Sequence, residues 1–516
     1  MGLSVWLPGA PFLAALLTLV LPSRRPTEIR LVTGLGCLVS LVLAIVAWLS
    51  YGSSQDGFQH VASLAWFTLP NVWLGHNLTI GLSFGVDGLS LPLLTLTAVI
   101  ALLAVIGVPR PAEQEKAYRF WQGLLVAAIL GVLTALDLFT FLVAVELALF
   151  SGFFLILQFG GPDRRHAAYK FLIYRGFASV GLLVVFIGLA YGLAGLYYSG
   201  GTAGSTPKLP GSVGTLTFSI ATLQHDVAHA ASVYGGIRPA LFLVLLLAVF
   251  IEEAFVPFHT WLPKAHEQAD TATNMLIGGM LTKTGAYVLL RFGVGMLPDE
   301  VHRFSLLLAV FGVINILYGA FAAWAARGWR RLTAFSSISH MGLVLLGISA
   351  MNSAGLQGAM FMMVSSGLLT AFLFYLAGAI EERTGSSQMD RLGGLSKSMP
   401  TLSGFLLFAA LGSLGLPLTS GFISEIQAFI GAFGGHPYLS FVGLLGLILS
   451  ATYLLYAIQK TTFGPRVPVA AAVDARAVEY LPLIVLTALV LVVGVYPEII
   501  GNLFGLSAGT LLGIGG

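Results

Sequence analysis

The chain is poor in charged residues. Asp, Glu, Lys and Arg make up 9% of its 516 residues, and 57% of the residues are hydrophobic. Ordinary soluble domains carry about 25% charged residues. So few charges could not cover the surface of a soluble fold of this length, so a soluble globular protein is excluded. The composition predicts a polytopic membrane protein, and the net charge of +3 gives no indication of nucleic-acid binding.

Cysteine is almost absent, since Cys37 is the only one. A single thiol can form no internal disulfide and cannot hold an iron–sulfur cluster. Cys37 lies in an apolar run and is interpreted as a small buried hydrophobic residue. No glycine-rich phosphate-binding motif follows a strand and opens a helix. The sequence therefore predicts no cofactor, flavin, nucleotide or metal ion bound to this chain.

One pair of histidines has a spacing found in metal sites. His225 and His229 lie four residues apart in the stretch LQHDVAHAASVY. This spacing could place two imidazoles on one helix face, but a zinc site needs further ligands, and none is evident. We interpret the stretch as a solvated surface helix.

Long apolar runs recur from one end of the chain to the other. A helix that spans a bilayer needs about 20 mostly apolar residues. The first run is as long as the later ones and lacks a basic start, so a signal peptide is not expected. Fourteen candidate spans lie at roughly 3–22, 29–50, 86–108, 118–136, 138–159, 167–196, 236–256, 271–295, 304–325, 332–350, 354–380, 401–432, 438–462 and 479–503.

The distribution of Lys and Arg among the loops predicts the orientation. Cations gather in every second loop, beginning with the loop after the first span, whereas residues 51–80 contain none. Arg291 and Arg303 are the main exceptions. Short cytoplasmic loops are enriched in Lys and Arg. We therefore expect a multi-pass protein of the cell inner or plasma membrane with both termini on the outer, periplasmic side.

Two of the predicted spans are interrupted by proline close to acidic residues. The stretch FIEEAFVPFHTWLPKAH places Glu252 and Glu253 just before Pro257, and LGSLGLPLTSGFISEIQAF contains Pro417 and Glu425. Proline frees a backbone carbonyl, and a break at membrane depth is tolerated where it lines a cavity or packs on protein. Paired broken helices indicate inverted repeats with an ion site at each break. Simple packing kinks are the alternative.

The breaks divide the predicted all-α fold into four parts. Spans 4–8 and 9–13 form two inverted five-helix repeats, in which helices 7 and 12 are broken. The expected domains are 1–110 for helices 1–3, 118–295 for the first repeat, 302–463 for the second repeat and 477–504 for helix 14.

Further ionisable residues lie inside apolar runs, namely Glu146, Arg175, Lys283 and His340. A buried Lys can lose its proton near neutrality, a buried Glu can keep one, and His titrates there by default. Together with Glu425, such a row predicts a proton relay across the bundle. Static salt bridges are the alternative interpretation.

Three motifs resemble a known family. They are VPFHTWLPKAHEQADTATNMLIGGMLTKTGAYVLLRF (256–292), RRLTAFSSISHMGLVLLGI (330–348) and GLPLTSGFISE (415–425). They are similar to the antiporter-like subunits of respiratory complex I (NADH–quinone oxidoreductase) and the related Mrp-type antiporter subunits. Within that family the chain looks most like the M subunit, because it lacks the C-terminal extension with a lateral helix of an L subunit and has Glu425 where an N subunit carries lysine.

The resemblance implies fourteen helices, two inverted repeats and proton translocation along a central polar axis. Glu146 matches the family's helix-5 glutamate, and Lys283 matches the central helix-8 lysine. His340 and Glu425 match a histidine of the axis and its terminal glutamate. Glu253 and His259 adjoin the first break and complete the set of candidate residues.

Two positions depart from the family pattern. Helix 7 usually carries a lysine seven residues before the histidine of VPFH, where this chain has Glu252, and Ser366 stands where helix 11 often has histidine. Glu146 and Glu252 would then be two neighbouring carboxylates sharing a proton. Our hypothesis is that Arg175 supplies the missing positive charge. The alternative is a degenerate input half, in which only Lys283, His340 and Glu425 conduct.

The leading hypothesis is a proton-translocating subunit of a complex I-type machine, a translocase with no redox site of its own. Its expected partners are other membrane subunits, the lipid bilayer, and protons or Na⁺. One alternative is a related assembly: a Na⁺/H⁺ antiporter, a membrane-bound hydrogenase or an inorganic-carbon uptake complex. Another is a structural scaffold with an inactive proton path.

Overall fold

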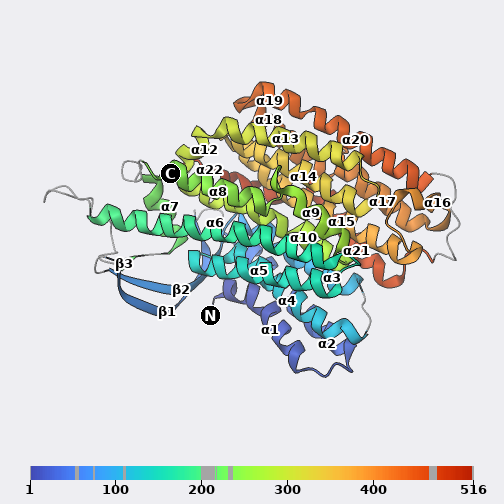
Figure 1. Cartoon of the computed structure of the whole chain (residues 1–516), viewed down its shortest axis with the longest axis horizontal. Helices are drawn as coiled ribbons and strands as arrows, with labels where there is room; N and C mark the ends of the chain where they lie inside the picture. Colours follow the sequence, from blue (N-terminus) through green and yellow to red (C-terminus); the bar gives the residue numbers. More distant parts are fainter. Residues whose placement is uncertain are drawn as a thin grey trace.

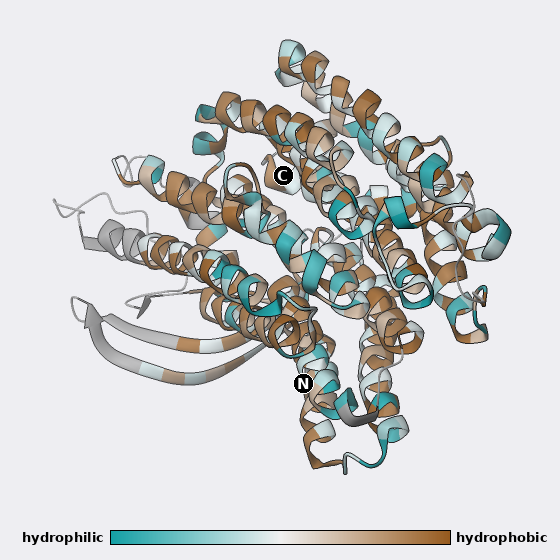
Figure 2. Cartoon of the chain, turned by 45° about the vertical axis from the view of Figure 1, so that its right-hand side comes forward, coloured by the Kyte–Doolittle hydropathy of each residue, from teal (hydrophilic) through white to brown (hydrophobic). Residues whose placement is uncertain are grey.

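The computed structural model describes residues 2–52, 57–73, 76–108, 112–198, 215–216, 218–229, 236–463 and 473–513. Its helices lie side by side in one bundle, with a long hairpin at one end (Figure 1). Apolar residues run along the long helices, and hydrophilic residues gather mainly at helix ends and connections (Figure 2). This arrangement agrees with a polytopic membrane protein.

Eleven helices in the described part of the chain are long and apolar enough to cross a membrane. Three of the fourteen predicted spans, 236–256, 271–295 and 401–432, are missing from this set. In the first the helix ends early, at Glu252, and the other two are divided into shorter helices. Two of these interruptions are the expected breaks in helices 7 and 12. The third, in helix 8, was not expected.

The N-terminal part contains a feature that the sequence reasoning missed. Helices α1 (Leu3–Val20), α2 (Pro26–Leu49) and α3 (Ser90–Gly107) are joined by an antiparallel hairpin of β1 (Gln59–Trp73) and β2 (His76–Val86), and β3 (Thr215–Leu216) pairs with β2 in parallel. The predicted all-α polytopic fold is confirmed for the chain, and the hairpin is a local addition to it. The strands lie in a stretch between long apolar helices, where the sequence pattern of a strand does not stand out from that of a loop.

The middle of the chain forms the first group of helices. Its elements are α4 (Ala112–Thr134), α5 (Leu138–Phe159), α6 (Arg164–Tyr198), α7 (Ile220–His229), α8 (Arg238–Glu252), η1 (Phe258–Thr260), α9 (Trp261–Gln268), α10 (Thr271–Gly279), η2 (Leu281–Lys283), α11 (Thr284–Val288), η3 (Leu289–Val294) and α12 (Pro298–Arg303). The short α7 buries Ile220, Leu223 and Val227, so it packs on the core and is not the solvated helix that we expected. The side chains of His225 and His229 lie outside the described residues.

The remainder forms the second group of helices. Its elements are α13 (Ser305–Trp324), α14 (Trp329–Ser349), α15 (Ser353–Thr384), η4 (Met389–Arg391), α16 (Leu395–Ser398), α17 (Pro400–Ser413), α18 (Ser420–Gly435), α19 (Pro437–Gly443), α20 (Leu445–Ile458), η5 (Gln459–Phe463), α21 (Ala477–Val495) and α22 (Glu498–Leu511). The predicted last span, 479–503, is divided between α21 and α22, because Pro497 forces Tyr496 out of the helical conformation.

Two of the helices end in wider turns. η3 and η5 are π-helical, and they follow α11 and α20 directly. Within η3, Arg291 forms an ion pair with Asp87 at 2.6 Å. A π turn holds its backbone hydrogen bonds between residues five apart, and it is uncommon outside functional or strained sites.

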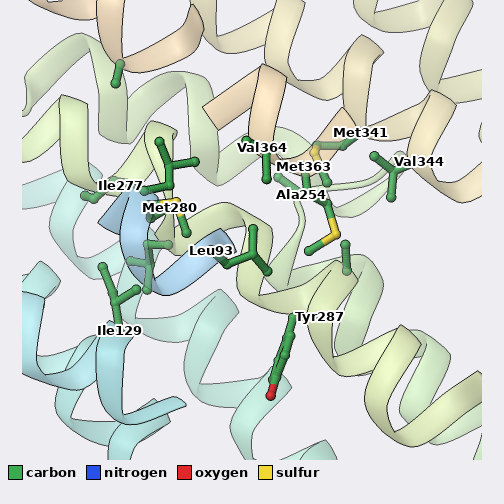
Figure 3. Close-up of a cluster of buried hydrophobic side chains, with 14 of the residues drawn as sticks. Leu93, Ile129, Ala254, Ile277, Met280, Tyr287, Met341, Val344, Met363 and Val364 are labelled. Atoms are coloured by element: carbon green, nitrogen blue, oxygen red, sulfur yellow. The ribbon is translucent and has the colours of Figure 1, made fainter. Parts of the chain in front are cut away.

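α14 and α15 lie at the centre of the bundle. The most apolar stretch of each is entirely buried inside the protein, whereas only 33% of the corresponding stretch of α2 is buried. Apolar side chains from α3, α4, α14 and α15 pack around the middle of the bundle, among them Leu93, Ile129, Met341 and Met363 (Figure 3). Polar side chains carried by α14 and α15 are therefore held in a packed interior.

Candidate functional site

The first break lies between α8 and η1, where Ala254 has a positive φ of 58°. The backbone groups freed by the break are bonded by side chains from other elements. The Ile251 carbonyl accepts a hydrogen bond from the Trp261 indole at 2.9 Å, and the Val256 amide donates to Asn315 of α13 at 2.8 Å. The broken segment is thus held in place by hydrogen bonds to side chains of neighbouring elements.

The acid at the end of α8 has a basic partner. Arg175 of α6 forms an ion pair with Glu252 through Nη2 and Oε2, and both residues are buried. The Arg175 guanidinium also lies 5.6 Å from the centre of the Phe171 ring and 5.8 Å from that of Trp261. The structure therefore brings Arg175 and Glu252 together, as hypothesised from the sequence.

Glu146 of α5 belongs to the same charged group. Its Oε1 accepts a hydrogen bond from the Ser179 hydroxyl at 2.5 Å. It interacts electrostatically with both Arg175 and Glu252. Two carboxylates therefore share one arginine, on three adjacent helices.

Glu253 points in a different direction from Glu252. Its side chain is fully buried, and its Oε1 accepts a hydrogen bond from the Ala286 amide of α11 at 2.5 Å. A Cβ placed on Gly285 would lie 2.7 Å from Glu253 Cγ and 3.0 Å from Glu252 Cβ. The absence of a side chain at Gly285 therefore lets helix 8 approach both acids.

Lys283 lies in the break that the sequence reasoning missed. α10 ends at Gly279, and Lys283 Nζ donates to the Gly278 carbonyl at 2.7 Å and to the hydroxyls of Thr282 and Ser337 at 3.2 Å each. The predicted continuous span 271–295 is therefore wrong. The adjacent pair Gly278–Gly279 was the available signal, because paired glycines favour kinks.

The second break lies between α17 and α18, where Gly415 and Leu418 have φ values of 78° and 74°. His340 of α14 contacts both helices of the break. Its Nε2 lies 3.3 Å from the Ser413 hydroxyl, and its Nδ1 lies 3.9 Å from Glu425 Oε1. A cavity of about 20 Å³ lies beside His340 and Glu425. That volume is enough for about one water molecule.

His259 has a separate position. Its Nε2 hydrogen-bonds to the Tyr318 hydroxyl of α13 at 2.9 Å. Within the described residues it makes no hydrogen bond or ion pair with another candidate. Ser366, at the position where the family often has histidine, is buried, and its hydroxyl has no partner in the described part of the chain.

The hydroxyl groups of the site could not be found from the sequence. Ser179, Ser337 and Ser413 are each hydrogen-bonded to one ionisable residue, Glu146, Lys283 and His340 respectively, and Tyr453 of α20 bonds to Ser336 at 2.8 Å. Serine is common in packed membrane helices, so nothing in its sequence context distinguishes these positions. The described residues contain no group of three or more His, Cys, Asp or Glu that could hold a metal ion.

The model of one protein family, NADH:quinone oxidoreductase/Mrp antiporter, TM, matches residues 135–450 of the chain. The chain belongs to this family. Among curated members, NAD(P)H-quinone oxidoreductase chain 4-2 of Synechocystis sp. is 34% identical over 469 residues, which cover 89% of this chain and 78% of the relative. Chain 4 1 of the Synechococcus elongatus enzyme is 35% identical over 474 residues, covering 89% and 82%. Both relatives are named chain 4 of their enzyme. The predicted family is therefore confirmed, but its relatives are named chain 4 rather than subunit M.

Two solved structures have folds similar to that of this chain. A chain of respiratory complex I from Thermus thermophilus with bound NADH superposes with a TM-score of 0.83 and 27% identity, over 100% of both chains. A chain of the Mrp complex from Dietzia sp. gives 0.80 with 22% identity, over 99% of this chain and 97% of that one. The second likeness shows the shared fold alone.

Proposed function

We propose that this chain is a proton-translocating membrane subunit of a complex I-type quinone oxidoreductase. One observation carries the proposal: buried ionisable residues lie at or beside the breaks in helices 7, 8 and 12. Glu252 and Glu253 lie at the first, Lys283 at the second along the chain, and Glu425 at the third. An ionisable residue inside a membrane protein is costly and is by default a functional-site hypothesis.

Each residue contributes according to its chemistry. Arg175 stays protonated, so it holds the Glu146–Glu252 pair without passing a proton on. Lys283 can exchange a proton, since its ammonium group is held by a carbonyl and two hydroxyls rather than by a direct ion pair in the described residues. His340 lies between Ser413 and Glu425 and can relay a proton between them.

The energy for this transport would come from partner subunits. Other membrane subunits of the assembly would adjoin the chain, with both of its termini on the outer side. Residues 118–295 and 302–463 would form the two inverted repeats. The breaks in helices 7 and 12 support this division, because they fall at corresponding places in the two groups.

A Na⁺/H⁺ antiporter complex is the second candidate assembly. The structural likeness to the Mrp complex chain favours it. In that case Lys283 and Glu425 would serve the same transport path with a different partner.

The test uses the intact membrane complex in liposomes and measures quinone reduction together with proton transport. Lys283→Met and Glu425→Gln should each lower proton transport at least about a hundredfold, the lower end of the range for a removed acid–base group. Lys397→Met, at an exposed lysine, is the control and should transport normally. Normal transport by both site variants would contradict the proposed function.

A further inference from the structure

Glu253 is a buried acid that the ion pair of the first break does not use. It directly follows α8, and its carboxyl faces the break in helix 8 rather than Arg175. Glu252, one residue earlier, forms the ion pair with Arg175. Two neighbouring glutamates therefore have different surroundings.

The two oxygens of the Glu253 carboxyl also differ. Oε1 is fixed by the Ala286 amide at 2.5 Å, whereas Oε2 is buried and has no hydrogen-bond partner within the described residues. Leaving a buried carboxylate oxygen unpaired is unfavourable. Oε2 is therefore suited to carry a proton or to bind a water molecule.

Three charged residues face this carboxyl: Arg175 of α6, Glu252 of α8 and Lys283 of η2. Lys283 is the basic residue with which Glu253 interacts most strongly. No direct ion pair joins Glu253 and Lys283 in the described part of the chain. Glu253 accepts a hydrogen bond from the amide of Ala286, three residues after Lys283. A single bridging water or a rotation of the lysine side chain would therefore bring the Lys283 ammonium into contact with the Glu253 carboxyl.

We infer that Glu253 is the proton-exchange partner of Lys283, in place of the helix-7 lysine that this chain lacks. The inference rests on the proposed function. The proton leaves Glu253 Oε2 and binds the lone pair of Lys283 Nζ. A carboxylic acid and a neutral amine become a carboxylate and an ammonium. The summed charge of the pair is zero before and after the step.

The alternative donor, Glu252, is less suited to this step. Its Oε2 is bound to Arg175, a cation that keeps its proton, so protonating Glu252 would break this ion pair. Glu253 makes no ion pair in the described residues, and Gly285 allows it to contact the turn after Lys283. The input half of the path would thus use Arg175–Glu252 as a fixed pair and Glu253 as the exchanging group.

The experiment compares Glu253→Gln with the wild type in the intact complex in liposomes. Glutamine keeps the shape and can still accept the hydrogen bond from the Ala286 amide, but it cannot ionise. We expect proton transport to fall at least about tenfold. We also expect infrared difference spectra to lose one protonated-carboxyl band and the pH profile of transport to lose one limb. These two signals would not change for a purely structural residue.

Glu300→Gln is the matched control. Glu300 of α12 is also buried, and its Oε2 also lacks a hydrogen-bond partner in the described residues, but it lies outside the candidate path. Its substitution should leave transport, the infrared band and the pH profile unchanged.

The outcomes separate this inference from the proposed function. If Lys283→Met stops transport while Glu253→Gln matches the wild type at every pH, the role of Glu253 is overturned and the proposed function stands. If Lys283→Met also transports normally, the proposed function itself fails. If Glu253→Gln does not assemble, Glu253→Asp replaces it: an altered pH profile supports the exchange, and an unaltered one overturns it.

Discussion

The breaks in helices 7 and 12 hold their acids in different ways. At the first, Glu252 is paired with Arg175, which keeps its charge at any working pH. At the second, Glu425 lies 3.9 Å from His340, whose imidazole, unlike a guanidinium, can gain and lose a proton. The first break therefore has a fixed cation and the second a titratable one. Similar backbone interruptions can thus serve different tasks, depending on what the neighbouring helix supplies.

Breaking the fixed pair should give the largest effect on stability. Arg175→Met leaves Glu252 buried without its cation, which costs about 3–5 kcal/mol when one partner of a buried pair is removed. His340→Met should cost less, because the contact with Glu425 is long. Thermal unfolding of the purified complex measures both.

Two further variants check the cause of that loss. Arg303→Met removes an arginine whose side chain is 64% exposed and should change the unfolding temperature little. The double variant Arg175→Met/Glu252→Gln removes both charges and should recover much of the stability. A double variant as unstable as Arg175→Met alone would show that packing on Phe171 and Trp261, not charge, dominates.

A substitution at Gly415 tests the backbone of the second break. Gly415 has a φ of 78°, and a Cβ there would collide with Glu425 Oε2. Gly415→Ala should cost about 1–3 kcal/mol in backbone strain and displace Glu425, so that transport falls as well. Gly385→Ala is the control, because Gly385 has a similar φ of 72° with nothing within 4 Å. It should lose stability without losing transport.

Gly285→Ala is the corresponding substitution near the first break, and we expect it to destabilise the protein by crowding rather than by backbone strain. Gly285→Ala would press on Glu252 and Glu253 and should cost about 1–3 kcal/mol from overpacking. Gly404→Ala, in α17 with nothing within 4 Å of the new Cβ, should be neutral or stabilising. Unfolding temperatures distinguish the two, and equal values would contradict the close approach of helix 8 to the acids.

The smallest expected effect on stability concerns Asp474, which caps the start of α17. Asp474 accepts hydrogen bonds from the amides of Thr401 and Leu402, at 2.8 and 3.2 Å. Burial opposes ionisation, but these hydrogen bonds prevail and hold the pKa of Asp474 below its usual value. The ionised Asp474 carboxylate therefore stabilises the folded protein at any pH above the ordinary pKa of an aspartate. This stabilisation is lost as the pH falls below that value and through the lower pKa that Asp474 has in the folded protein.

Asp474→Asn tests that sign. It should destabilise the protein by about 1 kcal/mol or less at neutral pH, since the site is partly solvated. The difference from the wild type should stay constant down to about pH 4 and shrink below it. A difference that grows on acidification would contradict this role for Asp474.

The sequence predicted the breaks in helices 7 and 12 well, because an uninterrupted membrane helix seldom places proline close to an acid. It also placed Arg175 beside Glu252, since a buried pair of acids requires a cation. It missed the break at Lys283 because no proline marks it. There the lysine side chain and the Glu253 carboxyl bond the freed backbone groups, and the pair Gly278–Gly279 is the only local signal that we find in the sequence. The hairpin of β1 and β2 was missed because strand patterning is weak beside long apolar helices.

The wide turn at Leu289–Val294 has a consequence for the protein's tolerance to insertion and deletion. A π turn contains one residue more than an α turn. Deleting one residue within it would therefore restore a regular α-helix and leave Lys283, before the turn, and the residues after it in their orientations. The same deletion in a regular α-helix would rotate all following residues by about 100° around the helix axis. Arg291 lies within the turn, so its ion pair with Asp87 is the contact that such a deletion would put at risk.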